Sequence, residues 1–155
     1  MQELSRRGLL KTVGVGAAGV LEQVDGFMVQ EMARPGKEVI LGMSLDPKFG
    51  PLLMFGMGGK YVEIVRDVSF RVLPLTDVDA QEMVREIQSY PLLEGVRGDV
   101  RVDIEFIVES VQRLAQLAAD TDLIEELDMN PVIVRPQRQE CRVVDARIRV
   151  RERTQ

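Results

Sequence analysis

Residues 38–55 have the sequence EVILGMSLDPKFGPLLMF, and this stretch decides the fold. In its first half apolar side chains alternate with polar or small ones, which is the period of a half-buried strand. The apolar face carries Val39, Leu41, Met43 and Leu45. The turn-forming run from Asp46 to Pro51 ends this strand, and the apolar run from Leu52 to Phe55 predicts a second one. Strands so close in sequence pair antiparallel, because a parallel crossover needs about a dozen residues or more.

Similar patterns continue on both sides of this hairpin. Further strands are predicted at residues 27–32, 61–67, 69–73, 124–127, 131–134 and 144–150. Thr76 is a predicted N-cap of a helix that ends at Pro91. A second helix is expected to begin at Asp103 and to carry an apolar stripe as far as about Ala119. The chain is therefore predicted to be α+β, an antiparallel sheet with two helices packed on it.

Composition excludes several classes of function. The 155 residues include 25 acidic and 20 basic side chains, and the net charge of −5 argues against nucleic acid or an anionic membrane as the main partner. The single cysteine, Cys141, excludes an internal disulfide. Because the chain has no histidine, imidazole-based triads and histidine-ligated zinc are excluded. A divalent metal would have to be held by oxygen ligands, which suits Mg²⁺.

The N-terminal residues differ from the rest of the chain. Ser5-Arg6-Arg7-Gly8-Leu9-Leu10-Lys11 resembles a twin-arginine export signal, and a weakly apolar run follows it. That run is too short for a membrane span, which takes about 20 apolar residues, so no stable membrane insertion is expected. The segment is either a genuine export signal or an artefact such as a mis-joined frame. We divide the chain into an atypical segment 1–25, a domain 26–150 and a tail 151–155.

Two stretches have backbone groups suited to a nucleotide. The strand end Val29-Gln30-Glu31-Met32 can present N–H and C=O groups to an adenine edge, with Glu38 available for a ribose hydroxyl; a solvated strand end gives the same pattern. Gly56-Met57-Gly58-Gly59 can expose consecutive N–H groups to a phosphate, or can simply form a tight turn. Both interpretations stay open for each stretch.

A third stretch has side chains suited to a metal. Asp128 and Asn130 lie on the same face of an extended segment, and Pro131 bars a helix there. Asp145 points away from the apolar face of its own strand. If the two strands pair across the turn at residues 137–139, Asn130 and Asp145 come close together. Mg²⁺ is typically held by one or two protein oxygens together with phosphates and water, so this pair is a candidate site; an ordinary polar surface is the alternative.

Taken together, these segments resemble the β-subunit of ADP-forming acetyl-CoA synthetases, and specifically the C-terminal half of its ATP-grasp domain. The quoted motifs at residues 29–32, 46–51, 56–59 and 126–131 carry the resemblance. It is extended by residues 36–43, 62–63, 66–71, 74–75, 90–93, 95–98 and 145–147. It runs from about Gly26 to Val150. The same domain also occurs fused to acetyltransferases.

The resemblance implies a role in an ADP-forming acid–CoA ligase, which converts an acid such as acetate, coenzyme A and ATP into acyl-CoA, ADP and phosphate. In that family ATP lies between two lobes, and this chain resembles the C-terminal lobe alone. The implied cofactors are ATP or ADP and Mg²⁺, with coenzyme A bound by a partner domain. The implied partners are an N-terminal ATP-grasp lobe and a CoA-binding subunit or domain that carries a phosphohistidine loop.

The resemblance also implies roles for individual residues. Gln30, Glu31 and Met32 correspond to the adenine hinge, Glu38 lies near the nucleotide, and Arg71 is a possible phosphate contact. Asn130 and Asp145 correspond to the Mg²⁺ ligands. Asp128 corresponds to the acidic residue that meets the phosphohistidine loop.

Alternatives to a catalytic lobe remain open. The chain could be a non-catalytic ATP-grasp-derived binding or regulatory module, or the ATP-grasp portion of an acetyltransferase fusion. ATP is scarce outside the cytoplasm, so a cytoplasmic protein is expected, with export as the alternative. A half-domain should expose apolar surface toward its missing lobe, and a homo-oligomer is then possible. The expected apolar residues are Met28, Met32, Phe49, Met54, Phe55 and Met57.

Overall fold

The computed structural model describes residues 29–59, 67–96 and 98–151. By its internal contacts the chain divides into the units Met1–Met32 and Ala33–Gln155. The export-like segment lies outside the described residues. The sheet and helices that follow all belong to the second unit.

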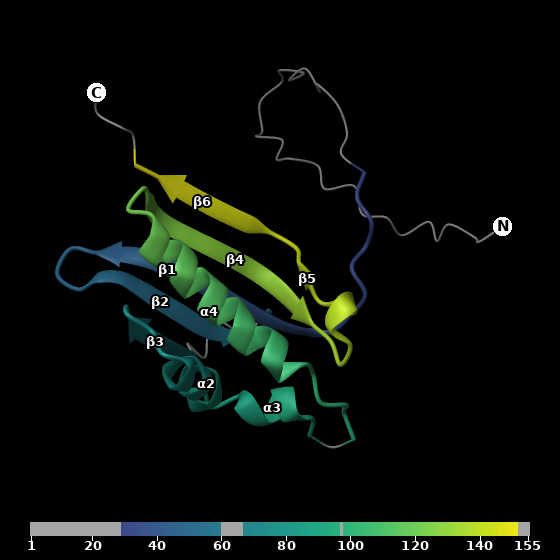
Figure 1. The fold of residues 1–155 in the computed structure, drawn as a ribbon. Coiled ribbons are helices and arrows are strands. Elements are labelled where there is room, and N and C mark those ends of the chain that lie inside the picture. The colour runs from purple at the N-terminus through teal and green to yellow at the C-terminus, as the bar shows by residue number, and fades with distance from the viewer. Residues whose placement is uncertain (1–28, 60–66, 97, 152–155) are drawn as a thin grey trace, which may run out of the picture. The chain divides into compact units, whose positions relative to one another are not determined.

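One antiparallel sheet forms the framework of this unit (Figure 1). Its strands are β1 (Lys37–Asp46), β2 (Gly50–Met57), β3 (Val68–Val72), β4 (Ile124–Val134), β5 (Arg142–Val143) and β6 (Ala146–Val150). The order is β3-β2-β1-β4-β5, and β6 also pairs with β4. The hairpin predicted from residues 38–55 is confirmed, because β1 and β2 pair antiparallel from Val39 opposite Met57 to Asp46 opposite Gly50.

Helices cover one face of the sheet, as Figure 1 shows. They are α2 (Asp77–Glu86), α3 (Tyr90–Glu94) and α4 (Ile104–Asp120), and the short 3-10 turn η1 (Arg138–Glu140) links β4 to β5. The core between the layers includes Val39, Leu41, Met43, Leu53, Phe55, Met83, Ile107, Val111 and Leu127. The predicted α+β class is thus confirmed. Phe55 is fully buried, so its predicted place on an exposed apolar patch was wrong.

Both predicted helix starts are confirmed by their caps. The Thr76 side chain accepts a hydrogen bond from the Asp79 N–H, and the Asp79 carboxylate accepts one from the Thr76 N–H, which is a complete capping box. Asp103 caps α4 by accepting from the Phe106 N–H at 2.8 Å. The predicted end of the first helix was wrong. That helix ends at Glu86, and Pro91 lies in the first turn of α3, where a missing N–H costs nothing.

Three strand predictions were also wrong. Residues 29–32 form no strand, and Val29 and Met32 are 94% and 72% exposed, so this apolar run buries little surface. Gly56 lies inside β2 and not in a turn. A side chain there would come within 2.7 Å of the Asp67 carbonyl oxygen, so the glycine allows β2 and the start of β3 to approach closely.

The third wrong strand prediction is the break at Pro131. Residues 124–134 form one continuous strand, β4. Proline cannot donate a ladder hydrogen bond, and the register of β4 with β1 shifts at this point, between Val39 and Leu41. Asn130 and Pro131 together lie opposite Ile40. The bulge therefore accommodates Pro131 within the strand, whereas the sequence pattern predicted a strand end there.

Asp67, just before β3, is a buried acidic side chain with 8% exposure. Its two carboxylate oxygens accept hydrogen bonds from the N–H groups of Gln88 and Ser89, both at 2.7 Å. Burial opposes ionisation, but the hydrogen bonds from Ser89 and Gln88 outweigh it and hold the pKa of Asp67 below its ordinary value. Asp67 thus ties the link between α2 and α3 to the edge of the sheet.

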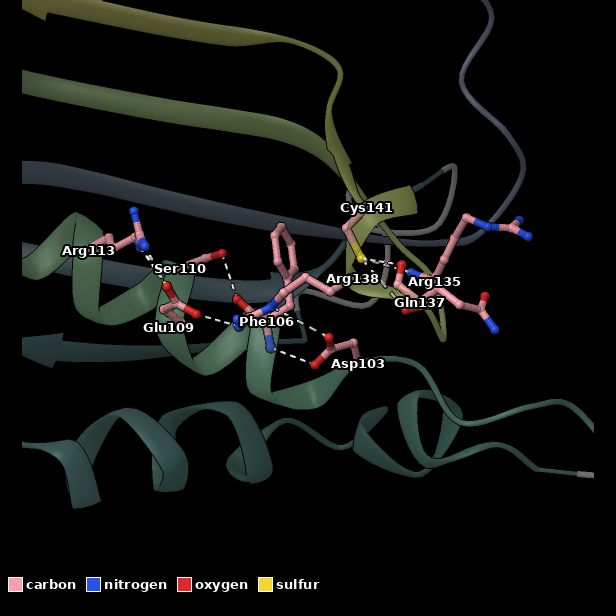
Figure 2. Close-up of polar contacts among 9 residues, drawn as sticks. All are labelled: Asp103, Phe106, Glu109, Ser110, Arg113, Arg135, Gln137, Arg138 and Cys141. Carbon is pink, nitrogen blue, oxygen red and sulfur yellow. Dashed lines mark hydrogen bonds and ion pairs between the residues drawn. The ribbon is translucent and has the colours of Figure 1, made fainter.

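Figure 2 shows how the turn between β4 and β5 is held against α4. Arg138 of η1 forms ion pairs with Asp103, at 3.6 Å, and with Glu109, and its guanidinium carbon lies 6.0 Å from the centre of the Phe106 ring. Cys141 is buried beside this turn, and burial raises the pKa of its thiol. These contacts hold the turn that precedes the final strands against α4. Within the part of the chain that the structure describes, no helix combines the length and apolar character needed to cross a membrane.

Candidate functional site on the open face of the sheet

The sheet face opposite the helices brings polar residues of β4 and β6 together. Gly42 of β1 lies directly opposite Asp128 of β4, and Asp128 lies directly opposite Arg147 of β6. Directly opposed residues of antiparallel strands have their side chains on the same face. Two residues along each strand, Glu126 lies opposite Arg149 in the same way. A ladder of carboxylates and guanidinium groups therefore runs along this face.

A pocket of about 440 Å³ opens above Gly42. Its charged side is formed by the β4–β6 ladder and its apolar side by Met54 of β2 and Phe70 of β3. Gly42 has no side chain to fill the space between the two sides. The pocket is therefore lined by carboxylates, guanidinium groups and apolar side chains of neighbouring strands.

The Asp128 carboxyl is the group whose ionisation this pocket disturbs. Burial raises its pKa, the charges of Asp145 and Glu126 raise it further, and Arg147 opposes them. Asp145 lies two positions before Arg147, the residue directly opposite Asp128, which brings the two carboxylates near one another. A proton or a cation approaching this place would be favoured.

Asn130 and Asp145 are neighbours, as the sequence predicted. The Asn130 N–H donates a hydrogen bond of 3.1 Å to the Asp145 carbonyl oxygen. The register of β4 is the same on both sides of this point, since Met129 lies opposite Ala146 and Val132 lies opposite Val143. Asn130 is therefore directly opposite Asp145. Their proximity is confirmed, whereas their role as metal ligands stays a prediction.

Glu38 lies at the other end of the open face, beside the two glycines that follow β2. The Gly58 N–H donates to the Glu38 carbonyl oxygen at 2.7 Å. A side chain built on Gly59 would approach the Glu38 carboxylate to 3.2 Å, so these glycines leave room for it. The backbone of these two glycines therefore packs directly against Glu38.

Arg71 does not join the other predicted site residues. It lies opposite Leu53 of the core, and it forms an ion pair of 2.7 Å with Glu86 of α2. Both contacts place it on the helix-covered face. Gln30, Glu31 and Met32 are exposed residues of the first unit, and the structure gives them no strand.

Sequence reasoning missed Gly42 as the floor of the pocket and Arg147 as its basic wall. The alternation along each strand does put Gly42 on the polar face of its strand, and Arg147 on the same face as Asp145. The alternation does not give the strand register, and it is the register that sets Gly42 and Arg147 opposite Asp128.

A family model described as an ATP-grasp domain matches residues 14–150. The chain belongs to this family. The match begins inside the segment 1–25 that we set apart. This ATP-grasp chain is 46% identical over 127 residues to the β-subunit of acetate–CoA ligase (ADP-forming) II from Pyrococcus furiosus. It is 47% identical over 126 residues to 4-hydroxybutyrate–CoA ligase (ADP-forming) from Nitrosopumilus maritimus.

These alignments cover 81% of the present ATP-grasp chain but 54% and 18% of the two relatives. The chain therefore spans only part of the length of the curated proteins that it matches. Both relatives are ADP-forming CoA ligases by name, and the resemblance predicted from the sequence motifs is confirmed.

Solved structures support the same fold. A dinucleotide-forming acetyl-coenzyme A synthetase 1 from Candidatus Korarchaeum cryptofilum matches with a TM-score of 0.74 and 49% identity, over 79% of this chain and 56% of that chain. That structure holds coenzyme A and Mg-AMPPCP, with a phosphohistidine segment pointing towards the nucleotide binding site. The apo form of the same synthetase matches with a TM-score of 0.73. The antiparallel ATP-grasp fold of this chain is thus confirmed.

Proposed function

We propose that this chain is the Mg-ATP-binding C-terminal lobe of an ADP-forming acid–CoA ligase. The observation that carries the proposal is the meeting of Asp128, Asn130 and Asp145 on adjoining strands of the open face. The similarity to ADP-forming CoA ligases over most of the chain supports it. The lobe requires an N-terminal ATP-grasp lobe and a CoA-binding partner, and we place it in the cytoplasm, where ATP is available.

The donor set fits Mg²⁺. Asn130 offers an amide oxygen and Asp145 a carboxylate, and both are hard oxygen ligands. Among the described residues no group of three or more acidic, cysteine or histidine side chains is arranged to hold a metal on its own. A two-ligand site suits Mg²⁺, which keeps several waters and is shared with substrate phosphates. When bound, Mg²⁺ neutralises charge on the phosphoryl oxygens of ATP.

Asp128 is suited to receive a histidine from a partner, because this chain has none of its own. Its half-buried carboxylate lies in the pocket and can accept a hydrogen bond from an imidazole N–H. Holding one ring nitrogen in this way orients the other toward the phosphoryl group. The contribution of Asp128 is then positioning, which is a large part of catalysis in phosphoryl transfer.

The remaining predicted residues are proposed to bind the adenosine part of the nucleotide. We propose that Gln30, Glu31 and Met32 contact adenine and that Glu38 lies near the ribose. The room that Gly58 and Gly59 leave around Glu38 supports its part of the assignment. Arg71 is left out, because its guanidinium is engaged by Glu86 on the other face.

A chimeric ligase tests the proposal. The aligned segment of this chain would replace its counterpart in the Pyrococcus furiosus β-subunit, which would then be assembled with its partner subunit and assayed for acetate- and CoA-dependent ADP formation. We expect turnover in the chimera, and a loss of at least about a hundredfold in Asp145→Asn, as for removal of a group that stabilises transition-state charge. Asp122→Asn, an exposed residue outside the site, is the control and should keep the rate.

Two outcomes count against the proposal. An Asp145→Asn chimera that turns over like its parent removes Asp145 from the metal site. A folded, assembled chimera that binds nucleotide but never produces ADP favours the non-catalytic binding module instead.

A further inference from the structure

The arginines of β6 and the arginine that follows it differ in their ion pairs. Arg149 forms ion pairs with Glu126 at 3.1 Å and with Glu125 at 3.6 Å. Arg151 reaches Glu125 at 3.7 Å. Both of these guanidinium groups therefore pair with carboxylates of the neighbouring strand β4.

Arg147 differs from these two. Among the described residues its ion pair is with Asp145, which lies two positions earlier, just before β6, at a distance of 3.7 Å. Its side chain is 82% exposed. Asp128 lies directly opposite, yet the two groups form no ion pair within the described part of the chain. Exposed pairs of this kind hold their partners weakly. Arg147 is therefore the pocket cation that a ligand can recruit at least cost.

We propose that Arg147 is the phosphoryl-binding residue of this pocket and that Asp145 exchanges the guanidinium of Arg147 for Mg²⁺. The inference rests on the proposed function, in which Asp145 is a metal ligand. A carboxylate that coordinates Mg²⁺ no longer balances the charge of Arg147. The released guanidinium lies beside the metal, where the phosphates of a bound nucleotide must also be. The planar fork of arginine donors matches phosphate oxygens in pairs.

The charges of the pocket make this binding conditional on the metal. Glu126 and Asp128 line the pocket together with Arg147 and Arg149, so its own charges balance. Asp145, which pairs with Arg147 beside the pocket, adds a third carboxylate and brings the local net charge to −1. A phosphoryl group approaching the pocket without metal is repelled. One Mg²⁺ at Asn130 and Asp145 changes the sign of the local charge, so the same group is then attracted. Metal and phosphoryl group thus bind cooperatively, with Asp145 as the shared element.

The experiment compares metal and nucleotide binding in the full 155-residue chain. Mn²⁺ replaces Mg²⁺ as a paramagnetic probe, its affinity is measured by electron paramagnetic resonance, and its position is found from the broadening of amide signals. The affinity for Mg-AMPPCP, a non-hydrolysable ATP analogue, is measured by calorimetry. The variants are Arg147→Gln, Arg147→Lys and, as a control directly after the end of the same strand, Arg151→Gln.

We expect Arg147→Gln to tighten Mn²⁺ binding by about two- to fivefold, because Asp145 loses the guanidinium that competes with the metal. This factor corresponds to the free energy of an exposed ion pair. The same variant should weaken Mg-AMPPCP binding by about tenfold or more, as the charge-assisted bonds to phosphate are lost. Arg147→Lys should keep the wild-type Mn²⁺ affinity and lose part of the nucleotide affinity. Arg151→Gln should leave both affinities within about twofold of wild type. Opposite shifts for metal and nucleotide would not arise from a merely structural arginine.

Other results overturn the inference. If Mn²⁺ broadens Asn130 and Asp145 but Arg147→Gln changes neither affinity, Arg147 has no part in the site and the proposed metal ligands stand. If Arg151→Gln has the same effects as Arg147→Gln, the effect is general electrostatics. If Mn²⁺ broadens neither Asn130 nor Asp145 in the wild-type chain, the proposed function fails and this inference fails with it.

Discussion

Asp67→Asn is predicted to destabilise the domain because the carboxylate uses both of its oxygens. One oxygen accepts from the Gln88 N–H and the other from the Ser89 N–H. The amide keeps one oxygen and turns an NH₂ group toward the second N–H. A buried donor without an acceptor costs about 1–3 kcal/mol. We expect about 2 kcal/mol at pH 7, which corresponds to about 4–8 °C in melting temperature for a chain of this size.

The pH dependence of this cost has a definite sign. The folded-state pKa of Asp67 lies below its ordinary value, so ionisation of Asp67 adds stability above the unfolded pKa, and that stability is lost as pH falls through the folded pKa. The difference between wild type and Asp67→Asn should therefore narrow below about pH 4. Urea unfolding followed by circular dichroism between pH 7 and pH 3 measures both quantities.

Asp46→Asn is the matched control. Asp46 also accepts two backbone N–H groups, from Lys48 at 2.8 Å and Phe49 at 3.0 Å, but it does so through a single oxygen that asparagine retains. Its turn is exposed, so the expected change is within about 0.5 kcal/mol. The reasoning is refuted if Asp67→Asn costs no more than Asp46→Asn, or if its cost is the same at pH 7 and pH 3.

Three further predictions use the same unfolding measurements. Gly56→Ala should cost about 1–3 kcal/mol, because a side chain there meets the Asp67 carbonyl oxygen and a Val68 methyl group at 2.7 Å; an unchanged midpoint would show that β3 yields freely. Asp128→Asn should raise the melting temperature at pH 7, because a raised folded pKa means that ionisation weakens the fold as pH rises; the gain should vanish near pH 3, and a loss at pH 7 would contradict the assigned shift. Deletion of residues 1–21 should leave the melting temperature nearly unchanged, whereas a fall of many degrees would show that this segment packs on the domain.

Local patterns predicted the elements whose cause is local. The alternation of β1 and the capping residues Thr76 and Asp103 depend on neighbours a few positions away, and the structure has all three as expected. Pro131 and Gly56 were misinterpreted for the opposite reason. Each is explained by another strand, the bulge against β1 for Pro131 and the close approach of β3 for Gly56, which no local pattern reveals.

Strand β3 places Arg71 on the helix-covered face of the sheet, an orientation that its hydrophobic pattern does not reveal. Its apolar residues alternate as if they faced the core, but Phe70 is 48% exposed and Ser69 is 5% exposed. The Ser69 hydroxyl donates to the Met83 carbonyl oxygen of α2 at 2.7 Å, which allows a polar residue to be buried. Arg71 follows Ser69 onto that face and meets Glu86. The hydrogen bond of Ser69 therefore accompanies an orientation of β3 in which Ser69 faces the helices and Phe70 faces away from them. Hydrophobicity alone predicts the opposite orientation.

The candidate site was predicted better than its surroundings. Asn130 and Asp145 could be placed together from the hairpin alone, because a short connection leaves two strands few ways to pair. The pocket above Gly42 could not, since it depends on residues from β1, β2, β3, β4 and β6 in one register. Sequence thus placed the two candidate ligands together, and the sheet gives the pocket its shape.

The most direct test of the proposed site is a crystal structure of the assembled chimeric ligase with Mg-AMPPCP. The side-chain oxygens of Asn130 and Asp145 should each lie about 2.1 Å from the metal, with nucleotide phosphates and water completing its octahedron. A metal held by other residues, or Asn130 and Asp145 side chains on opposite faces of the sheet, would contradict the site.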